Sequence, residues 1–232
     1  MNITVSGYNR PAYLAQTCDA LSRCVGVAGC RVAVLLDPCD ETPECAEIAD
    51  RHGWESHVFV AHAGCNDAIY TAMRFGFESM QSHYHLHLED DTVPTRDALL
   101  WFSWARDKYR NDPNVMTVSG YQHRSNGRPD RCGTRRWFTP WGWATWGDRW
   151  QGMRDRWADR DGPSWDVIVN YGIRGTRREA FPTVSRIQNI GAEKGTHVFN
   201  AEWHAANHHV PETADDICDE AVTDFVDDGP FP

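Results

Sequence analysis

The sequence predicts one α/β domain built on an open, mainly parallel β-sheet. Short β-rich runs alternate with helical patterns through the first 120 residues, which is typical of such sheets. Acidic residues directly follow two of these runs, and the chain of 232 residues contains no stretch that resembles a linker between two domains. A hydrophobic fraction of 41% is sufficient for a buried core.

Local signals justify the expected elements in chain order. Pro11 suits the first turn of a helix, the Thr42-Pro43 pair suits a cap and first helical position, and Asn66 suits another cap. Apolar runs bounded by turn residues predict the strands. The strands are expected at 3–6, 32–36, 57–60, 84–88 and 115–118, and the helices at 11–24, 42–51, 66–79 and 95–109, with a long loop over 120–133.

Acidic residues stand at two of the predicted strand ends. Asp37 follows the strand 32–36, and Glu89, Asp90 and Asp91 follow the strand 84–88. Ligands of open α/β sheets bind outside the carboxyl ends of the strands, so these acids are expected to face a ligand. Three consecutive carboxylates at a buried strand end repel one another, and Mn²⁺ or Mg²⁺ relieves that repulsion. A metal that bridges a carboxylate and a pyrophosphate stabilises a nucleotide leaving group.

Charge is distributed unevenly along the chain, whose net charge is −10. Residues 124–178 hold 12 arginines, no lysine and 6 aspartates, whereas residues 199–232 hold nine acids and no lysine or arginine. One interpretation is scattered surface arginines and a solvated acidic tail; the other is a central segment that faces something anionic. In the second interpretation, arginines in the loop at the start of this segment would bind a phosphorylated glycan, a teichoic-type polymer or nucleic acid.

Cysteine usage and hydropathy predict the compartment of the protein. The eight cysteines form no CxxC pair, which predicts reduced thiols and no zinc site. No apolar run approaches the roughly 18 residues of a membrane span. Met1 leads directly into a strand-like run, so we expect no signal peptide and a cytoplasmic protein.

A series of short motifs extends over residues 3–198: SGYNRPAYL, NDAIYTAMRFGF, HLEDDTVPTRDALLWF, NDPNVMTVSGYQ, FTPWGWATWGDRW, SWD and SRIQNIGAEKGTH. In this order they resemble the motifs of the N-acetylglucosaminyltransferase I family, including its protein O-mannose branch, and PWGWATW also resembles a segment of related bacterial glycosyltransferases. The resemblance implies a single-domain GT-A fold, an open mixed sheet flanked by helices. It implies a catalytic domain over 1–198, with a nucleotide-sugar half of about 1–120 and an acceptor half of about 121–198, before an acidic C-terminal segment 199–232.

The resemblance also implies roles for the residues around the acids. Arg10 would approach the nucleotide diphosphate, and Asp37 the uracil or ribose. Glu89 would contact the hydroxyls of the donor sugar, and Asp90 the ribose. Asp91 would bind the metal ion, Mn²⁺ or Mg²⁺.

Three further roles follow from the downstream motifs. Asp166 would be the general base that deprotonates the acceptor hydroxyl, and Trp165 would help to wall the sugar pocket. His197 would lie near the diphosphate or the metal. The family usually has two acids after that tryptophan, whereas Val167 follows Asp166 in this sequence.

The tryptophans and arginines of the central segment are the candidates for the acceptor side. At least half of the six tryptophans between 137 and 157 are expected to pack in the core, while one or two stack on sugar rings. We expect Trp141 and Trp143 on the acceptor side, together with Arg135 and Arg136.

The histidines are expected to be structural. His83, His85 and His87 alternate along a strand and therefore share one face, where they form a polar layer rather than a metal site. His204 and His208 lack the glutamate of the metalloprotease pattern and are expected to be an ordinary surface pair.

The sequence therefore predicts a metal-dependent hexosyl- or N-acetylhexosaminyl-transferase that moves a sugar from a UDP-sugar, or another nucleotide sugar, to a hydroxyl acceptor, with inversion by resemblance. The acceptor is a protein or glycan hydroxyl or, alternatively, a hydroxymethylated base in DNA, which the basic segment permits and the net acidity disfavours. A non-catalytic nucleotide-sugar-binding module on the same fold stays open. A nucleotidyltransferase also stays open, although no glycine-rich signature supports it.

Overall fold

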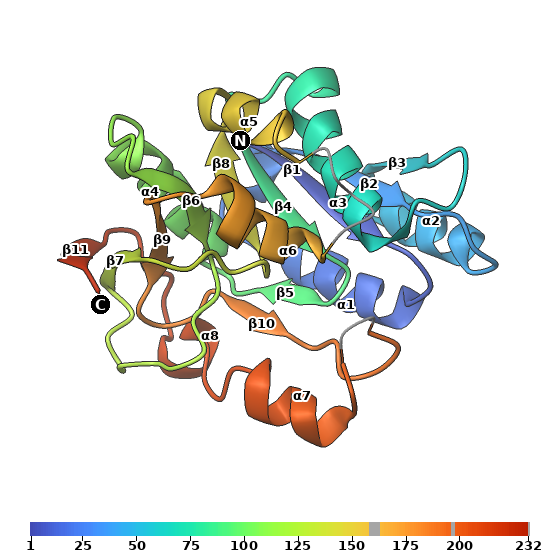
Figure 1. Cartoon of the computed structure of the whole chain (residues 1–232). Helices are drawn as coiled ribbons and strands as arrows, with labels where there is room; N and C mark the ends of the chain where they lie inside the picture. The colour runs from blue at the N-terminus through green and yellow to red at the C-terminus, as the bar shows by residue number, and fades with distance from the viewer. Residues whose placement is uncertain (158–162, 196–197, 232) are drawn as a thin grey trace.

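The computed structural model describes residues 1–157, 163–195 and 198–231. Within these residues nine strands form one mixed sheet (Figure 1). Their spatial order is β11 (Val226–Pro230), β7 (Arg131–Arg135), β9 (Arg178–Pro182), β6 (Val115–Ser119), β8 (Trp143–Trp146), β4 (Tyr84–Glu89), β1 (Asn2–Gly7), β2 (Arg31–Leu36) and β3 (Glu55–Val58). A separate antiparallel pair consists of β5 (Thr92–Pro94) and β10 (Ile187–Asn189).

The first half of the chain forms the parallel part of the sheet. β3, β2, β1 and β4 run parallel, whereas β8 lies antiparallel between β4 and β6. Parallel strands place their carboxyl ends at one edge, so the turns after β1, β2 and β4 meet there. The sequence-based prediction of an open sheet flanked by helices is confirmed.

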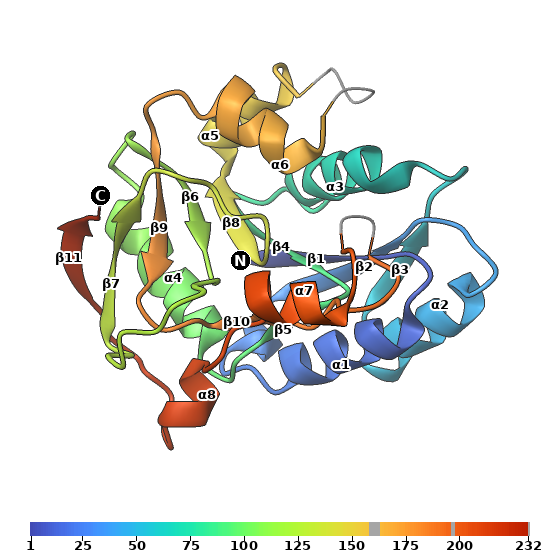
Figure 2. The same cartoon turned by 60° about the horizontal axis from the view of Figure 1, so that its bottom comes forward.

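Helices cover both faces of the sheet (Figure 2). One face carries α1 (Pro11–Ser22), α2 (Thr42–Arg51) and α4 (Ala98–Tyr109), whose apolar side chains join the main core with those of β1, β2 and β4. The other face carries α3 (Gly64–Arg74), α5 (Gly147–Arg154) and α6 (Trp165–Val167), which share a tryptophan-rich cluster. No helix in the described part of the chain is long and apolar enough to cross a membrane.

The helix predicted from an Asn66 cap begins two residues earlier. α3 starts at Gly64 and continues into a π-helical turn, Phe75–Ser79. Asp37 accepts the backbone N–H groups of Ala63 and Gly64, which satisfies donors at the start of the helix. Asn66 instead accepts a hydrogen bond from the backbone N–H of Trp165, at 2.8 Å, and joins α3 to α6.

The acidic segment 199–232 is part of the fold and not a free tail. It contributes α7 (Ala201–Asn207), α8 (Ala214–Ile217) and β11, which pairs with β7 at the edge of the sheet. Arg131 of β7 forms an ion pair with Asp228 of β11, with Nη1 2.8 Å from Oδ1. Within the predicted loop 120–133, β7 already begins at Arg131.

The predicted histidine layer is present beneath the carboxyl ends of the central strands. His85 and His87 are fully buried, and both contact the hydroxyl of Thr4, at 2.8 and 3.0 Å. Burial lowers the pKa of each to about 3, so both rings are neutral. His83 is exposed and does not join them.

Candidate active site

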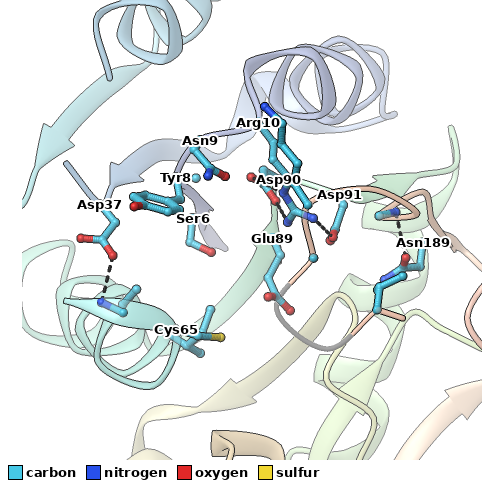
Figure 3. Close-up of a pocket in the computed structure, with 18 of the residues that line it drawn as sticks. Ser6, Tyr8, Asn9, Arg10, Asp37, Cys65, Glu89, Asp90, Asp91 and Asn189 are labelled. Atoms are coloured by element: carbon cyan, nitrogen blue, oxygen red, sulfur yellow. Dashed lines mark hydrogen bonds and ion pairs between the residues drawn. The ribbon is translucent and has the colours of Figure 1, made fainter. Parts of the chain in front are cut away.

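A cleft of about 370 Å³ opens at the carboxyl ends of β1, β2 and β4 (Figure 3). Its walls come from the turn after β1, the acids after β4, the first turn of α3 and the segment that follows β10, with Trp141 and His208 completing the rim. This is the position at which the strand-end acids predicted a ligand.

Sheet register brings the predicted acids together. Ser6 of β1 pairs with Leu35 of β2 on one side and with Glu89 of β4 on the other. Asp37 and Asp90, the first residues after β2 and β4, therefore flank the turn that follows β1. Local strand endings and parallel pairing are sufficient to build this part of the cleft.

Arg10 binds two of the three consecutive acids. Its guanidinium donates to Asp90, and its Nη1 lies 2.9 Å from Oδ2 of Asp91 (Figure 3). Burial lowers the pKa of Arg10, but the charges of Asp91 and Asp90 outweigh burial and raise it. Burial and the charge of Asp91 raise the pKa of Asp90 to about 7. Burial and both neighbouring acids raise the pKa of Glu89 well above its usual value.

The three acids fit a divalent cation whose other ligands come from a substrate. Among the described residues, no group of three His, Cys, Asp or Glu side chains is arranged to hold a metal alone. Mg²⁺ is commonly bound by one or two carboxylates together with substrate phosphates, so a complete protein cage is not required. A cation at Asp91 would relieve the repulsion that raises the pKa of Glu89 and Asp90. The predicted neighbour of the metal, His197, lies outside the described residues.

Asp37 stabilises the rim of the cleft opposite the acids. Its carboxylate accepts the N–H groups of Ala63 and Gly64 at 2.8 and 3.0 Å, and it lies 3.0 Å from Nδ1 of His62. The ring of Tyr8 lies 5.0 Å from that of His62 and is 38% exposed. An aromatic face is therefore available beside Asp37, where the sequence analysis had identified only the carboxylate.

The segment after β10 forms the wall beside Asp91. Asn189 of β10 pairs with Thr92 of β5, and the N–H of Ile190 donates to the backbone oxygen of Asp91 at 2.9 Å. The next residue, Gly191, lines the cleft against the Asp91 side chain. Antiparallel pairing thus brings together residues about one hundred positions apart.

His204 holds that wall in place from α7. Its Nε2 lies 2.7 Å from Oδ1 of Asn189, and the same oxygen accepts the N–H of Gly191 at 3.0 Å. Burial lowers the pKa of His204, which favours the neutral ring. The predicted surface pair is therefore wrong: His204 is 3% exposed, and His208 lines the cleft.

Trp141 lies on the predicted acceptor side, within an aromatic group. Its ring centroid is 4.6 Å from that of Tyr121 and 4.5 Å from that of His208. The Tyr121 hydroxyl donates to the backbone oxygen of His208 at 2.8 Å, and the Trp203 ring lies 4.6 Å beyond His208. The C-terminal segment therefore helps to build this rim.

Asp166 lies on α6, beside the cleft but outside the residues that line it. The hydroxyl of Ser164 donates to its Oδ1 at 2.5 Å. The charge of Asp166 contributes to the raised pKa of Glu89 and of the Cys65 thiol, for which burial is the main cause. Asp166 is thus close enough to the acids to interact with them electrostatically.

Trp143 and Trp165 are core residues. They are 0% and 3% exposed, and their rings stack 5.8 Å apart. Trp165 also stacks on Trp157, at 5.7 Å. Neither side chain lines the cleft, so the structure gives no support to the predicted contacts of these two residues with sugar. Both belong to the apolar cluster that α3, α5 and α6 share.

Arg135 and Arg136 have different environments. Arg135 donates two hydrogen bonds to the fully buried Glu179, at 2.8 and 3.0 Å, and one to the backbone oxygen of Tyr121. Its charge is therefore neutralised inside the fold. Arg136 is exposed, with its guanidinium 5.1 Å from the ring centroid of Trp137.

Several cleft residues were missed by sequence reasoning. Tyr8 belongs to the turn that contains Arg10, so its place beside the acids could have been inferred. Asn189, Gly191 and His208 reach the cleft only through the pairing of β10 with β5 and the packing of α7, which no local pattern indicates.

Comparisons with known proteins identify the fold and no closer relationship. No protein-family model matches the sequence, and no curated protein matches it. Residues 1–349 of S. aureus TarS superpose with a TM-score of 0.58 and 9% identity, over 80% of this chain and 58% of that one. Mannosyltransferase PcManGT from Pyrobaculum calidifontis, in complex with GDP-Man and Mn²⁺, gives a TM-score of 0.50 and 17% identity, over 80% and 57%.

The chain spans somewhat more than half the length of these two structures. Identities this low establish architecture, and the predicted likeness to the N-acetylglucosaminyltransferase I family stays a prediction. What the chain shares with these two structures is the GT-A fold, as predicted from the sequence.

Proposed function

We propose that this chain is a metal-dependent glycosyltransferase that moves a sugar from a UDP-sugar, or another nucleotide sugar, to a hydroxyl acceptor. The observation that carries the proposal is the meeting of Glu89, Asp90 and Asp91 with Arg10 in one cleft, at the carboxyl ends of parallel strands in a GT-A fold. Support for the class of donor comes from PcManGT, a protein of this fold whose structure contains GDP-Man and Mn²⁺.

The chain offers separate groups for the two ends of the donor. Arg10 is a cation at the position proposed for the diphosphate, and Mn²⁺ or Mg²⁺ at Asp91 would supply Lewis-acid neutralisation of the leaving group. Tyr8 and Asp37 lie at the opposite rim, where a planar base has an aromatic face to stack on. Glu89 lies between these ends and would accept hydrogen bonds from sugar hydroxyls (Figure 3).

Acceptor chemistry is proposed for the α6 side of the cleft. Asp166 would take the proton of the acceptor hydroxyl, and Ser164 fixes one of its carboxylate oxygens. Attack on the face opposite the diphosphate inverts the anomeric centre. Trp141 provides a half-buried ring for the acceptor on the part of the rim that His208 helps to build.

A thermal-shift screen of nucleotide sugars with Mn²⁺ tests the donor. A ligand at a hundred times its Kd stabilises a fold by about 2.7 kcal/mol, which raises the Tm of a chain of this size by roughly 5–11 °C. We expect this shift with at least one UDP-sugar and its loss in EDTA. Slow release of UDP from that sugar separates an enzyme from a binding module, and release of pyrophosphate indicates a nucleotidyltransferase. A panel in which no nucleotide changes the Tm contradicts the proposal.

Gly191→Ala is expected to weaken the binding of Mn²⁺ in the presence of UDP at least tenfold. An added Cβ would overlap Oδ2 of Asp91 and lie 2.9 Å from its Cγ, so the carboxylate must turn away. The matched control is Gly152→Ala, because nothing lies within 4 Å of a Cβ at that helical position. Electron paramagnetic resonance of free Mn²⁺ measures both variants, and equal affinities would show that Asp91 is not a ligand.

A further inference from the structure

A second surface combines exposed aromatic rings with two arginines that form no ion pair with any carboxylate of the described residues. The guanidinium of Arg136 lies 5.1 Å from the ring centroid of Trp137, and that of Arg174 lies 5.3 Å from it. The ring of Tyr171 lies 5.8 Å from that of Trp137. Trp137 is 46% exposed and Tyr171 is 75% exposed. We call these four residues the arginine–tryptophan surface.

Hydrogen bonds hold the two segments of this surface together. Asn170 accepts the N–H of Phe138 at 2.9 Å and donates to its backbone oxygen at 3.0 Å. Arg174 is 5% exposed and donates from Nη1 to the backbone oxygen of Arg177, while its buried Nε has no hydrogen-bond partner in the part of the chain that the structure describes. The arrangement is therefore fixed before any ligand binds, which reduces the entropy cost of binding.

Within the described residues, the only carboxylate charge that acts on the pKa of Arg174 is that of Glu179, which raises it. Among the described residues, no ion pair joins Arg136 or Arg174 to a carboxylate, whereas Arg135 and Arg131 are paired with Glu179 and Asp228. Burial and the neighbouring charge of Arg136 lower the pKa of Arg174. The exposed guanidinium of Arg136, held beside the buried charge of Arg174, favours an anionic ligand.

The exposed rings of Trp137 and Tyr171, beside the exposed guanidinium of Arg136, match single-stranded nucleic acid. Such proteins combine cationic side chains, which follow the phosphates, with aromatic rings, on which unpaired bases stack. A neutral sugar would also stack on these rings, but it would leave the exposed guanidinium of Arg136 without a counter-charge. A duplex has its bases stacked on one another and offers no free face to Tyr171. A phosphate-linked glycan would use the arginines and give the exposed rings less to bind.

We propose that the arginine–tryptophan surface binds an unpaired segment of a nucleic acid, and that this nucleic acid carries the acceptor hydroxyl. The second half of the inference rests on the proposed glycosyl transfer; the first half does not. Tyr171 lies five residues beyond Asp166 on one continuous helical segment, and Arg136 lies five residues before Trp141 of the cleft. Five residues span at most about 18 Å, so a bound strand of a few nucleotides reaches the cleft.

Fluorescence anisotropy with a labelled 20-nucleotide oligo(dT) tests the surface. We expect the wild-type chain to bind it more tightly than a duplex of the same length or inorganic polyphosphate, with an affinity that falls as salt rises. Tyr171→Ala should weaken binding about tenfold or more, because the stacking of one base on this ring is lost. Tyr171→Phe keeps the ring and should bind as the wild type does.

Arg136→Glu should weaken binding and reduce its salt dependence, and Arg51→Glu, an exposed arginine on α2, is the charge control. Absence of oligo(dT) binding at low salt overturns the proposal. Equal binding of polyphosphate, with no effect of Tyr171→Ala, also overturns it and would indicate a phosphate-linked polymer. Tighter binding of the duplex than of oligo(dT) overturns it as well. Stabilisation by UDP and Mn²⁺ is a separate measurement: its absence alongside oligo(dT) binding defeats the proposed transfer and leaves the nucleic-acid surface standing.

Discussion

Asp91→Asn is expected to reduce metal-dependent release of UDP from the donor sugar by about a thousandfold or more. A metal ion contributes several kcal/mol to stabilising a leaving group, and each 1.36 kcal/mol corresponds to a factor of ten in rate. Asparagine keeps the size of the side chain but removes the charge that would hold the cation. UDP release at saturating Mn²⁺ and the effect of Mn²⁺ on the Tm with UDP present are the two measurements.

The same substitution should not unfold the chain. Asp91 contributes to the raised pKa of both Glu89 and Asp90, so removing its charge relieves repulsion and offsets the loss of its ion pair with Arg10, which keeps its bond to Asp90. We expect a Tm without metal that equals or exceeds that of the wild type. Asp50→Asn, at an exposed position on α2, controls for loss of one negative charge. Mn²⁺-dependent activity within tenfold of the wild type would place the cation elsewhere.

The sequence was sufficient for the parts of the site that depend on strand endings. The apolar run before Glu89 predicts β4, the run before Asp37 predicts β2, and parallel pairing with β1 brings both ends beside Arg10. The strand endings are signalled locally in the sequence. The order of the strands is not, but the alternation of strands and helices leaves few possible orders. The central sheet and its acidic edge could therefore be predicted.

The remaining parts depend on tertiary packing that leaves no periodic signal. β11 comes from a segment so acidic that it resembles a solvated tail, yet Asp228 reaches Arg131 across the sheet edge. Arg135 belongs to an arginine-rich stretch of the sequence, but it ends β7 and is neutralised by Glu179, a partner 44 residues away. In the sequence, His204 resembles one residue of a surface pair, but in the structure α7 places it against Asn189. The sequence shows the charge and type of each of these residues, but the partner of each is set by tertiary packing.

Asp166→Asn is expected to lower kcat for transfer by about 10²–10⁴, the usual contribution of a general base. Binding of the donor should be unchanged, because Asp166 lies on α6 outside the residues that line the cleft. Ser164→Ala removes only the 2.5 Å hydrogen bond to its Oδ1 and should cost less than tenfold, since it affects orientation and leaves the base in place. Initial rates of transfer and the Tm shift with UDP and Mn²⁺ separate these effects.

Glu89 is the carboxylate that could replace Asp166 in this role. It points into the centre of the cleft, and burial with its two acidic neighbours raises its pKa well above the usual value (Figure 3). A cation at Asp91 would offset that repulsion and favour the ionised form of Glu89. If Asp166→Asn leaves transfer within tenfold of the wild type while Glu89→Gln abolishes it without weakening donor binding, the base is Glu89, and Asp166 acts only through its charge.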